Sequence, residues 1–284
     1  MKAVHSPRWI IIPPCPDRPE WVSALQLAAA EQGLTVADAD AGPSTGDLIV
    51  ASDAAKALQA GVAPDNLAVI LSEIGILTPE VDSAPITDKL HAAVRSSSEL
   101  FRRARQLPVE RVFPAQAFDA GPVEILPGLT LTRPATTASS TPRNRALGQA
   151  IAIYADGQAH WRGEIFNYTS QTVRHEEDRT TIDLTGRPRF LIFGPYVTMP
   201  AGRWKAIIRL GFDQTAARYQ YRADWGEQET YGSHIFRPLR EGVYDLEMEF
   251  EWSKPSACEM RLLVLEGAFD GEVSFMGVQL SRAD

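Results

Sequence analysis

Residues 244–252 alternate strictly between apolar and acidic side chains, and this pattern constrains the fold more than any other in the chain. Tyr244, Leu246, Met248, Phe250 and Trp252 share one parity, whereas Asp245, Glu247, Glu249 and Glu251 share the other. Successive side chains of a strand point to opposite faces of a sheet. The pattern therefore predicts a strand with one buried face and one wet, acidic face.

Comparable strand-like segments, separated by glycine- and proline-containing turns, recur throughout residues 150–284. They span residues 150–154, 160–168, 180–184, 189–197, 203–212, 217–225, 231–238, 242–252, 259–266 and 272–280. Many short strands at this spacing are typical of an antiparallel sandwich or jelly roll. We therefore predict a jelly-roll-like antiparallel β-sandwich domain over residues 150–284.

The first part of the chain instead alternates short apolar runs with helical segments. Strands are predicted at residues 9–12, 34–37, 47–51, 67–71 and 111–113, and helices at 19–32, 54–60 and 87–107. Alternating β and α elements predict a parallel sheet with helices on its faces. We therefore expect residues 1–118 to form a small Rossmann-like α/β domain, in which Asp17 is a candidate N-cap of the first helix.

Residues 119–149 are rich in proline, serine and threonine, which is typical of a linker. Within them, residues 123–133 fit a β-hairpin or a pair of edge strands. The chain is thus expected to consist of an α/β domain, a linker and an all-β domain.

Charge and cysteine content exclude several classes of function. The formal net charge of −8 argues against nucleic-acid binding, which needs a surplus of Lys and Arg, and against docking on an anionic membrane. Cys15 and Cys258 are too few for a disulfide framework, so we expect free thiols. Pro13 and Pro14 interrupt the apolar run near the N-terminus. We therefore expect no signal peptide, and synthesis in the cytoplasm with assembly into a particle as a route to the exterior.

A complete catalytic or metal-binding set is absent from the sequence. Residues 42–46 contain two glycines, but a strand rather than a helix follows them, so they present no helical N–H groups for a phosphate cradle. Ser52 and Asp53 follow a predicted strand, where α/β enzymes place active residues, but the pair also fits a helix N-cap, which we favour. Residues 175–178 are interpreted as a solvated loop rather than a metal site. We predict no cofactor, no metal and no catalytic residue.

The C-terminal part concentrates the aromatic residues, which points to recognition of a ligand. Sugars stack their C–H faces on Trp or Tyr, while charged and amide side chains bond the hydroxyls. Trp204 and Trp252 are assigned to the core, and the face shared by Tyr219, Tyr221 and Trp225 stays open as core or platform. Trp225 is expected to be the most exposed aromatic. The predicted ligand-binding residues are Trp225, Asp224, Arg222, Tyr231, Trp161, Arg162 and Asn167.

Residues 183–280 also contain a set of short sequence motifs. It consists of Gly194-Pro195-Tyr196, Pro200-Ala201-Gly202-Arg203-Trp204, and residues 217–226, 242–252 and 265–280. This stretch resembles the carbohydrate-binding-module-like β-sandwich appended to bacterial glycosyltransferase-like and polysaccharide proteins. The resemblance implies association with a glycan. Part of the pattern also has a structural interpretation, because Gly194-Pro195 and residues 200–202 fit turns, and Tyr196 and Trp204 fit core anchors.

Three functions stay open at this point. The first is non-catalytic binding of a bacterial cell-surface or capsular polysaccharide, as in the spike or fibre of a phage-like particle, with a protein partner docked on the N-terminal domain. The second is a glycosyltransferase or related enzyme of polysaccharide biosynthesis, because the first domain faintly resembles a nucleotide-sugar fold. One lobe is small for such an enzyme. The third is a structural assembly protein. The sugar and the possible homo-oligomer are not specified by the sequence.

Overall fold

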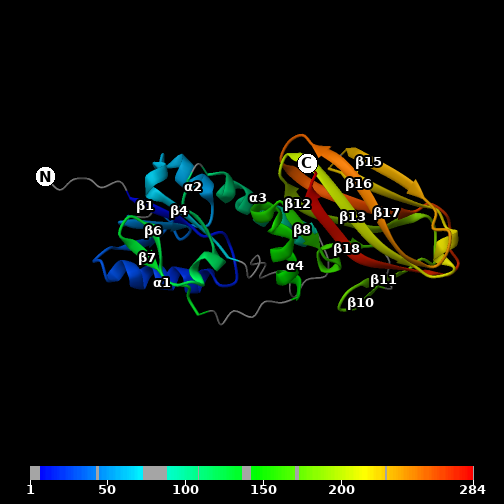
Figure 1. The fold of residues 1–284 in the computed structure, drawn as a ribbon, viewed down its shortest axis with the longest axis horizontal. Coiled ribbons are helices and arrows are strands. Elements are labelled where there is room, and N and C mark those ends of the chain that lie inside the picture. Colours follow the sequence, from blue (N-terminus) through cyan, green and yellow to red (C-terminus); the bar gives the residue numbers. More distant parts are fainter. Residues whose placement is uncertain are drawn as a thin grey trace. The chain divides into compact units, whose positions relative to one another are not determined.

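The computed structural model describes residues 7–42, 45–72, 88–107, 109–135, 142–169, 173–227 and 229–283. The chain forms two compact units, residues 1–77 with 96–144 and residues 78–95 with 145–284, which we describe separately (Figure 1). Within the described ranges, none of the helices is both long enough and apolar enough to span a membrane.

The first unit is built on a five-stranded parallel sheet of order β2-β3-β1-β4-β5. Its strands are β1 (Arg8–Ile11), β2 (Val36–Asp38), β3 (Leu48–Ala51), β4 (Leu67–Leu71) and β5 (Val112–Pro114). The connections contain α1 (Arg18–Ala30), α2 (Ala54–Gln59), η1 (Pro64–Asn66) and α3 (Asp88–Gln106), and η2 (Ala115–Phe118) follows β5. The predicted parallel sheet with helices is confirmed.

The order of this sheet differs from that of a Rossmann fold. There the strand order is 3-2-1-4-5-6, whereas here β2 lies at the edge outside β3. The described residues between β2 and β3 also contain no helix. The Rossmann-like assignment is therefore not confirmed.

A β-hairpin completes the core of the first unit. It pairs β6 (Val123–Leu126) with β7 (Leu129–Leu131), which confirms the hairpin expected within residues 123–133. Its buried side chains pack with those of α1 and of one face of the sheet in a single hydrophobic cluster. This cluster contains Ile10, Ile12, Trp21, Leu25, Leu48, Val50, Ile70, Ile125, Leu126, Leu129 and Leu131. Part of the expected linker thus packs as core.

The strand predicted at residues 150–154 is wrong, because these residues belong to the helices α4 (Pro142–Ile151) and α5 (Ile153–Asp156). Ala146, Leu147, Ala150 and Ile151 are all buried. Their spacing is that of one helix face. The apolar residues from Ala150 onward continue a helical period that begins earlier in the chain.

The second unit is an antiparallel β-sandwich, as predicted. One sheet, called here the β13 sheet, has the order β10-β11-β18-β13-β16, with β8 paired to β18. The other, the β14 sheet, has the order β15-β14-β17-β12-β9. From β11 to β18 the chain passes from one sheet to the other at nearly every connection, which gives the expected jelly-roll-like arrangement.

The strands of the sandwich mostly match their predicted positions. They are β8 (Gln158–Trp161), β9 (Asn167–Tyr168), β10 (Val173–His175), β11 (Thr180–Asp183), β12 (Arg189–Met199), β13 (Gly202–Phe212), β14 (Tyr221–Gly226), β15 (Thr230–Phe236), β16 (Gly242–Trp252), β17 (Ser256–Val264) and β18 (Glu272–Arg282). The predicted single strand at residues 160–168 is wrong, because β8 and β9 belong to different sheets and η3 (Gly163–Ile165) separates them. β14 begins later than predicted, after η4 (Ala216–Arg218).

Aromatic rings fill the space between the two sheets. Trp161 of β8 stacks on Trp225 of β14 with ring centroids 5.7 Å apart, and Trp225 contacts Phe250 of β16 at 4.6 Å. Trp204 and Trp252 are buried, as predicted. The prediction that Trp225 is exposed is wrong, since its side chain is 0% exposed. Trp225 points to the inner face of β14, where Trp161 and Phe250 of the opposite sheet cover it.

The residues that carry the family resemblance have structural roles. Pro200 and Ala201 form the turn between β12 and β13, as expected, but Gly194 and Pro195 lie inside β12, next to an irregularity of its pairing with β17. Tyr196 is half-buried, and its hydroxyl donates to Glu259 Oε1 at 2.6 Å. Cys15 and Cys258 are buried free thiols.

Candidate functional site

Three adjoining hollows lie over the outer face of the β13 sheet. Their volumes are about 470, 210 and 270 Å³. His160 lines all three, and the third hollow shares Ile207 and Gln279 with the first and Asp178 and Met276 with the second. We call this connected depression the His160 groove. Its size is in the range of small-molecule sites, about 300–1,000 Å³.

Strand register explains why these side chains face outward. His160 precedes the buried Trp161 in β8, and Gln279 lies between the buried Val278 and Leu280 in β18. His160 and Gln279 are direct neighbours in the β8–β18 pair, and Gln279 is paired with Ile207 of β13. Three adjacent strands therefore each contribute one side chain to the groove floor.

A β-bulge in β18 positions the His160 ring. In the pairing with β13, Ile208 is opposite Val278 and Leu210 is opposite Phe275, so β18 has an extra residue at Met276 and Gly277. Gly277 has a φ of +96°, and a Cβ there would lie 2.9 Å from His160 Nε2 and 2.7 Å from the Trp161 carbonyl oxygen. Only glycine fits this position, so the imidazole lies directly against the bulge.

One wall of the groove is a fixed ion pair. Arg209 donates from Nε and Nη2 to the two carboxylate oxygens of Asp245, at 2.9 and 3.1 Å. Such bidentate pairs are geometrically specific. The pair therefore presents its remaining donors and lone pairs at defined positions. Asp245 is engaged on both oxygens, which suits recognition rather than proton transfer.

Arg162 is the predicted ligand-binding residue that lines this groove, at the second hollow. Its Nη2 donates to the Glu177 carbonyl at 2.5 Å and pairs with Glu164 at 3.0 Å. The interpretation of residues 175–178 as a solvated loop agrees with their exposure. The described residues contain no group of three or more ligands arranged for a metal ion.

The other predicted site residues lie elsewhere. Trp161 and Trp225 are in the core, so neither offers an exposed platform for a sugar. Asp224 is 4% exposed and accepts from Arg222 Nε at 3.0 Å and Ser233 Oγ at 2.7 Å, on the outer face of the β14 sheet. Asn167 is also buried and donates to the Phe193 carbonyl oxygen at 3.4 Å. The bonds of Ser233 to Asp224 and of Asn167 to Phe193 tie neighbouring strands together, and the Arg222–Asp224 pair lies within β14.

Tyr231 is exposed on β15, and its hydroxyl donates to Glu227. The sequence-based prediction of the site did not include Gln279, Ile207 or Met276. The alternation of side chains along a strand could have indicated the groove. If Trp161 points into the core, its neighbours His160 and Arg162 must face outward.

Comparison with known proteins found no matching family model and no matching curated protein. Among solved structures, TmCBM61 in complex with β-1,4-galactotriose is 11% identical and covers 42% of this chain and 87% of its own, with a TM-score of 0.32. The C-terminal CBM6 of LamC from Zobellia galactanivorans is 13% identical and covers 44% of this chain and 99% of its own, also at 0.32. Both are carbohydrate-binding modules. The sandwich assignment rests on the strand pairing of this chain itself.

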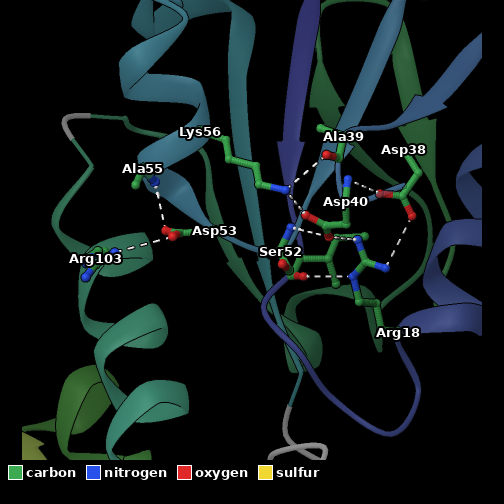
Figure 2. Close-up of polar contacts among 10 residues, drawn as sticks. Arg18, Asp38, Ala39, Asp40, Ser52, Asp53, Ala55, Lys56 and Arg103 are labelled. Atoms are coloured by element: carbon green, nitrogen blue, oxygen red, sulfur yellow. Dashed lines mark hydrogen bonds and ion pairs between the residues drawn. The ribbon is translucent and has the colours of Figure 1, made fainter. Parts of the chain in front are cut away.

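A second polar cluster lies in the first unit, where strands of the parallel sheet end (Figure 2). Asp40 accepts from Lys56 Nζ at 2.6 Å, from Arg18 Nη2 at 2.8 Å and from the Ser52 N–H at 2.9 Å. Asp53 Oδ1 accepts from the Ala55 N–H at 2.9 Å, which confirms Asp53 as the N-cap of α2. The carboxylates are matched by donors, so this cluster joins β2, β3 and α2 rather than forming an open site.

Acid is expected to weaken the first unit through Asp40. Burial raises the pKa of Asp40, but the bonds from Lys56 and Ser52 and the charge of Arg18 outweigh it, so the pKa lies below its usual value. A lowered folded-state pKa stabilises the fold above the unfolded-state pKa, about 4, and this stabilisation disappears as the pH falls through the folded-state value. We expect the free energy of unfolding to fall below about pH 4.

The Asp40→Asn variant tests this expectation. It is expected to be less stable than the wild type at pH 7 and to lose less stability between pH 4 and pH 2, as measured by denaturant unfolding. An equally steep loss in the variant would assign the acid sensitivity to other groups.

Proposed function

We propose that the second unit binds a polysaccharide in the His160 groove without converting it. The observation that supports this proposal is the groove on the outer face of the β13 sheet. Gln158, His160, Gln279 and Arg209 supply donors and acceptors suited to sugar hydroxyls. Ile207 and Met276 supply apolar contacts for the C–H faces of a sugar ring.

The lining also sets the expected strength of binding. Among the described residues that line the three hollows, the imidazoles of His160 and His175 are the only aromatic rings, so hydrogen bonds rather than stacking on Trp or Tyr provide most of the contacts. Hydrogen bonds between ligand and protein replace bonds to water and contribute only about 0.5–1.5 kcal/mol each. We therefore expect dissociation constants of about 10 μM to 1 mM for a short oligosaccharide.

The ligand we propose is a bacterial cell-surface or capsular polysaccharide, and the setting a spike or fibre of a phage-like particle. Weak sites of this kind suit a polymer of repeating units, because many copies of the protein can bind one polysaccharide chain at the same time. In the first unit, a hollow of about 800 Å³ between α1 and residues 122–135 includes Leu27, which is 69% exposed. This hollow supports attachment of the first unit to a protein partner.

A screen of bacterial surface polysaccharides followed by calorimetry tests the proposal on the full chain. His160→Ala and Gln279→Ala are expected to weaken binding of the best glycan at least about tenfold, which corresponds to about 1.4 kcal/mol. Gln214→Ala is the matched control, because Gln214 is exposed in the turn after β13. It is expected to bind as the wild type does.

Two outcomes would contradict the proposal. The first is that the wild-type chain binds none of the polysaccharides. The second is that His160→Ala and Gln279→Ala both bind the best glycan with wild-type affinity. A nucleotide-sugar that raises the melting temperature of the first unit would instead favour an enzyme of polysaccharide synthesis.

A further inference from the structure

β15 forms an edge of the β14 sheet with little protection. Within the described part of the chain, β14 is the strand with which it pairs. Five of its seven residues are exposed. An edge strand presents a row of backbone N–H and C=O groups that can pair with a strand of another chain.

The other edges of the sandwich are protected against such pairing. β16, which lies next to β15 in the fold (Figure 1), carries exposed acidic side chains at every second position from Asp245 to Glu251. β8, β10 and β9 are only four, three and two residues long. Charged side chains and short length are the usual means of protecting an edge. β15 has neither, because it is seven residues long and contains no Lys, Arg, Asp, Glu or Pro.

Charge makes the β15 segment complementary to itself. Glu229 and Arg237 lie on opposite sides of Ser233, each four residues away. When two copies pair antiparallel about Ser233, Glu229 of each copy is opposite Arg237 of the other. Arg237 also pairs with Glu266 of its own chain at 2.5 Å, but a guanidinium has five N–H donors and can serve both carboxylates.

We propose that two copies of this chain associate by antiparallel pairing of their β15 strands, so that their β14 sheets form one continuous sheet. Ile235, near the C-terminal end of this edge strand, is 56% exposed in the single chain. Pairing would cover part of this apolar side chain. A second copy is the occupant because it alone supplies both the matching uncharged strand and the reversed order of the two charges.

This dimer is independent of glycan binding, because the His160 groove lies on the β13 sheet. Both grooves stay open when β15 is paired. The two grooves of one dimer would hold a repeating polysaccharide at two points, which raises the apparent affinity of the dimer for the polysaccharide.

Sedimentation velocity of the full chain over a range of concentrations tests the proposal. The mass is expected to approach twice the 31.2 kDa of the chain. Ile235→Lys places a charge on the edge and is expected to weaken association at least about tenfold. Phe269→Lys is the matched control, because Phe269 is 95% exposed in a loop and this change should leave association unaltered. Melting curves establish that both variants fold.

A charge exchange tests the register. Glu229→Arg and Arg237→Glu each place like charges opposite one another, so each variant alone is expected to associate more weakly. An equimolar mixture restores opposite charges at both positions and is expected to recover association. A wild type that is monomeric at every concentration, association that survives Ile235→Lys, or a mixture no tighter than its components would each overturn the proposal.

Discussion

Replacing Trp225 by alanine is expected to destabilise the β-sandwich by about 3–5 kcal/mol, the cost of removing a large aromatic side chain from a packed core. Trp225 is 0% exposed, stacks on Trp161 and contacts Phe250. Among the described residues its Nε1 has no hydrogen-bond partner, so the loss is one of packing. Glycan binding should disappear only in step with unfolding of the second unit.

Hydrogen exchange read by mass spectrometry locates this effect. In the Trp225→Ala variant, peptides from β12 to β18 are expected to exchange faster, while peptides from β1 to β4 keep their wild-type rates. Phe269→Ala is the control, because Phe269 is 95% exposed and its removal should change stability by less than about 0.5 kcal/mol. A Trp225→Ala variant that keeps wild-type exchange but loses glycan binding would instead restore Trp225 as a contact residue.

The second large effect is expected in the first unit, for Asp17→Ala. Asp17 is 3% exposed, and its carboxylate accepts from Trp21 Nε1 at 2.8 Å and from Ser72 Oγ at 2.6 Å. It occupies the N-cap position of α1 as expected, but its side chain makes no capping bond. Removing the carboxylate takes an acceptor from two buried donors, so we expect a loss of about 3 kcal/mol.

Denaturant unfolding of the Asp17→Ala variant measures this loss. Asp38→Ala is the matched control, because the Asp38 side chain is 35% exposed and its ion pair with Arg18 is 3.5 Å long. Such a surface pair contributes about 0–1 kcal/mol. Equal losses in the two variants would show that the buried bonds of Asp17 have no special weight.

The fold was largely predictable because its signals are local. Alternation in residues 242–252 matches β16 in both bounds, and the apolar run 67–71 matches β4. The errors arose where a short window hid a longer period or a change of sheet. Residues 150–154 span the end of α4 and the start of α5, and residues 160–168 cross from one sheet to the other within a few residues.

The candidate site was less predictable because it depends on long-range pairing. The groove forms because β8 lies beside β18 and β18 beside β13, so that His160, Gln279 and Ile207 meet. No local pattern specifies that order of strands. The aromatic surplus was misleading for a related reason: a sandwich core also needs large flat side chains, and Trp161 and Trp225 fill it.

The central claim is that a glycan binds in the His160 groove. Methyl NMR tests it most directly, with the full chain labelled at Ile and Met and titrated with an oligosaccharide that the screen identifies. Ile207 and Met276 line the His160 groove, whereas Ile235 is exposed on the β15 edge and Ile10 is buried in the first unit. Binding in the groove predicts that the Ile207 and Met276 methyl signals shift with a common dissociation constant while those of Ile235 and Ile10 do not. Saturable shifts that leave Ile207 and Met276 unchanged would contradict it.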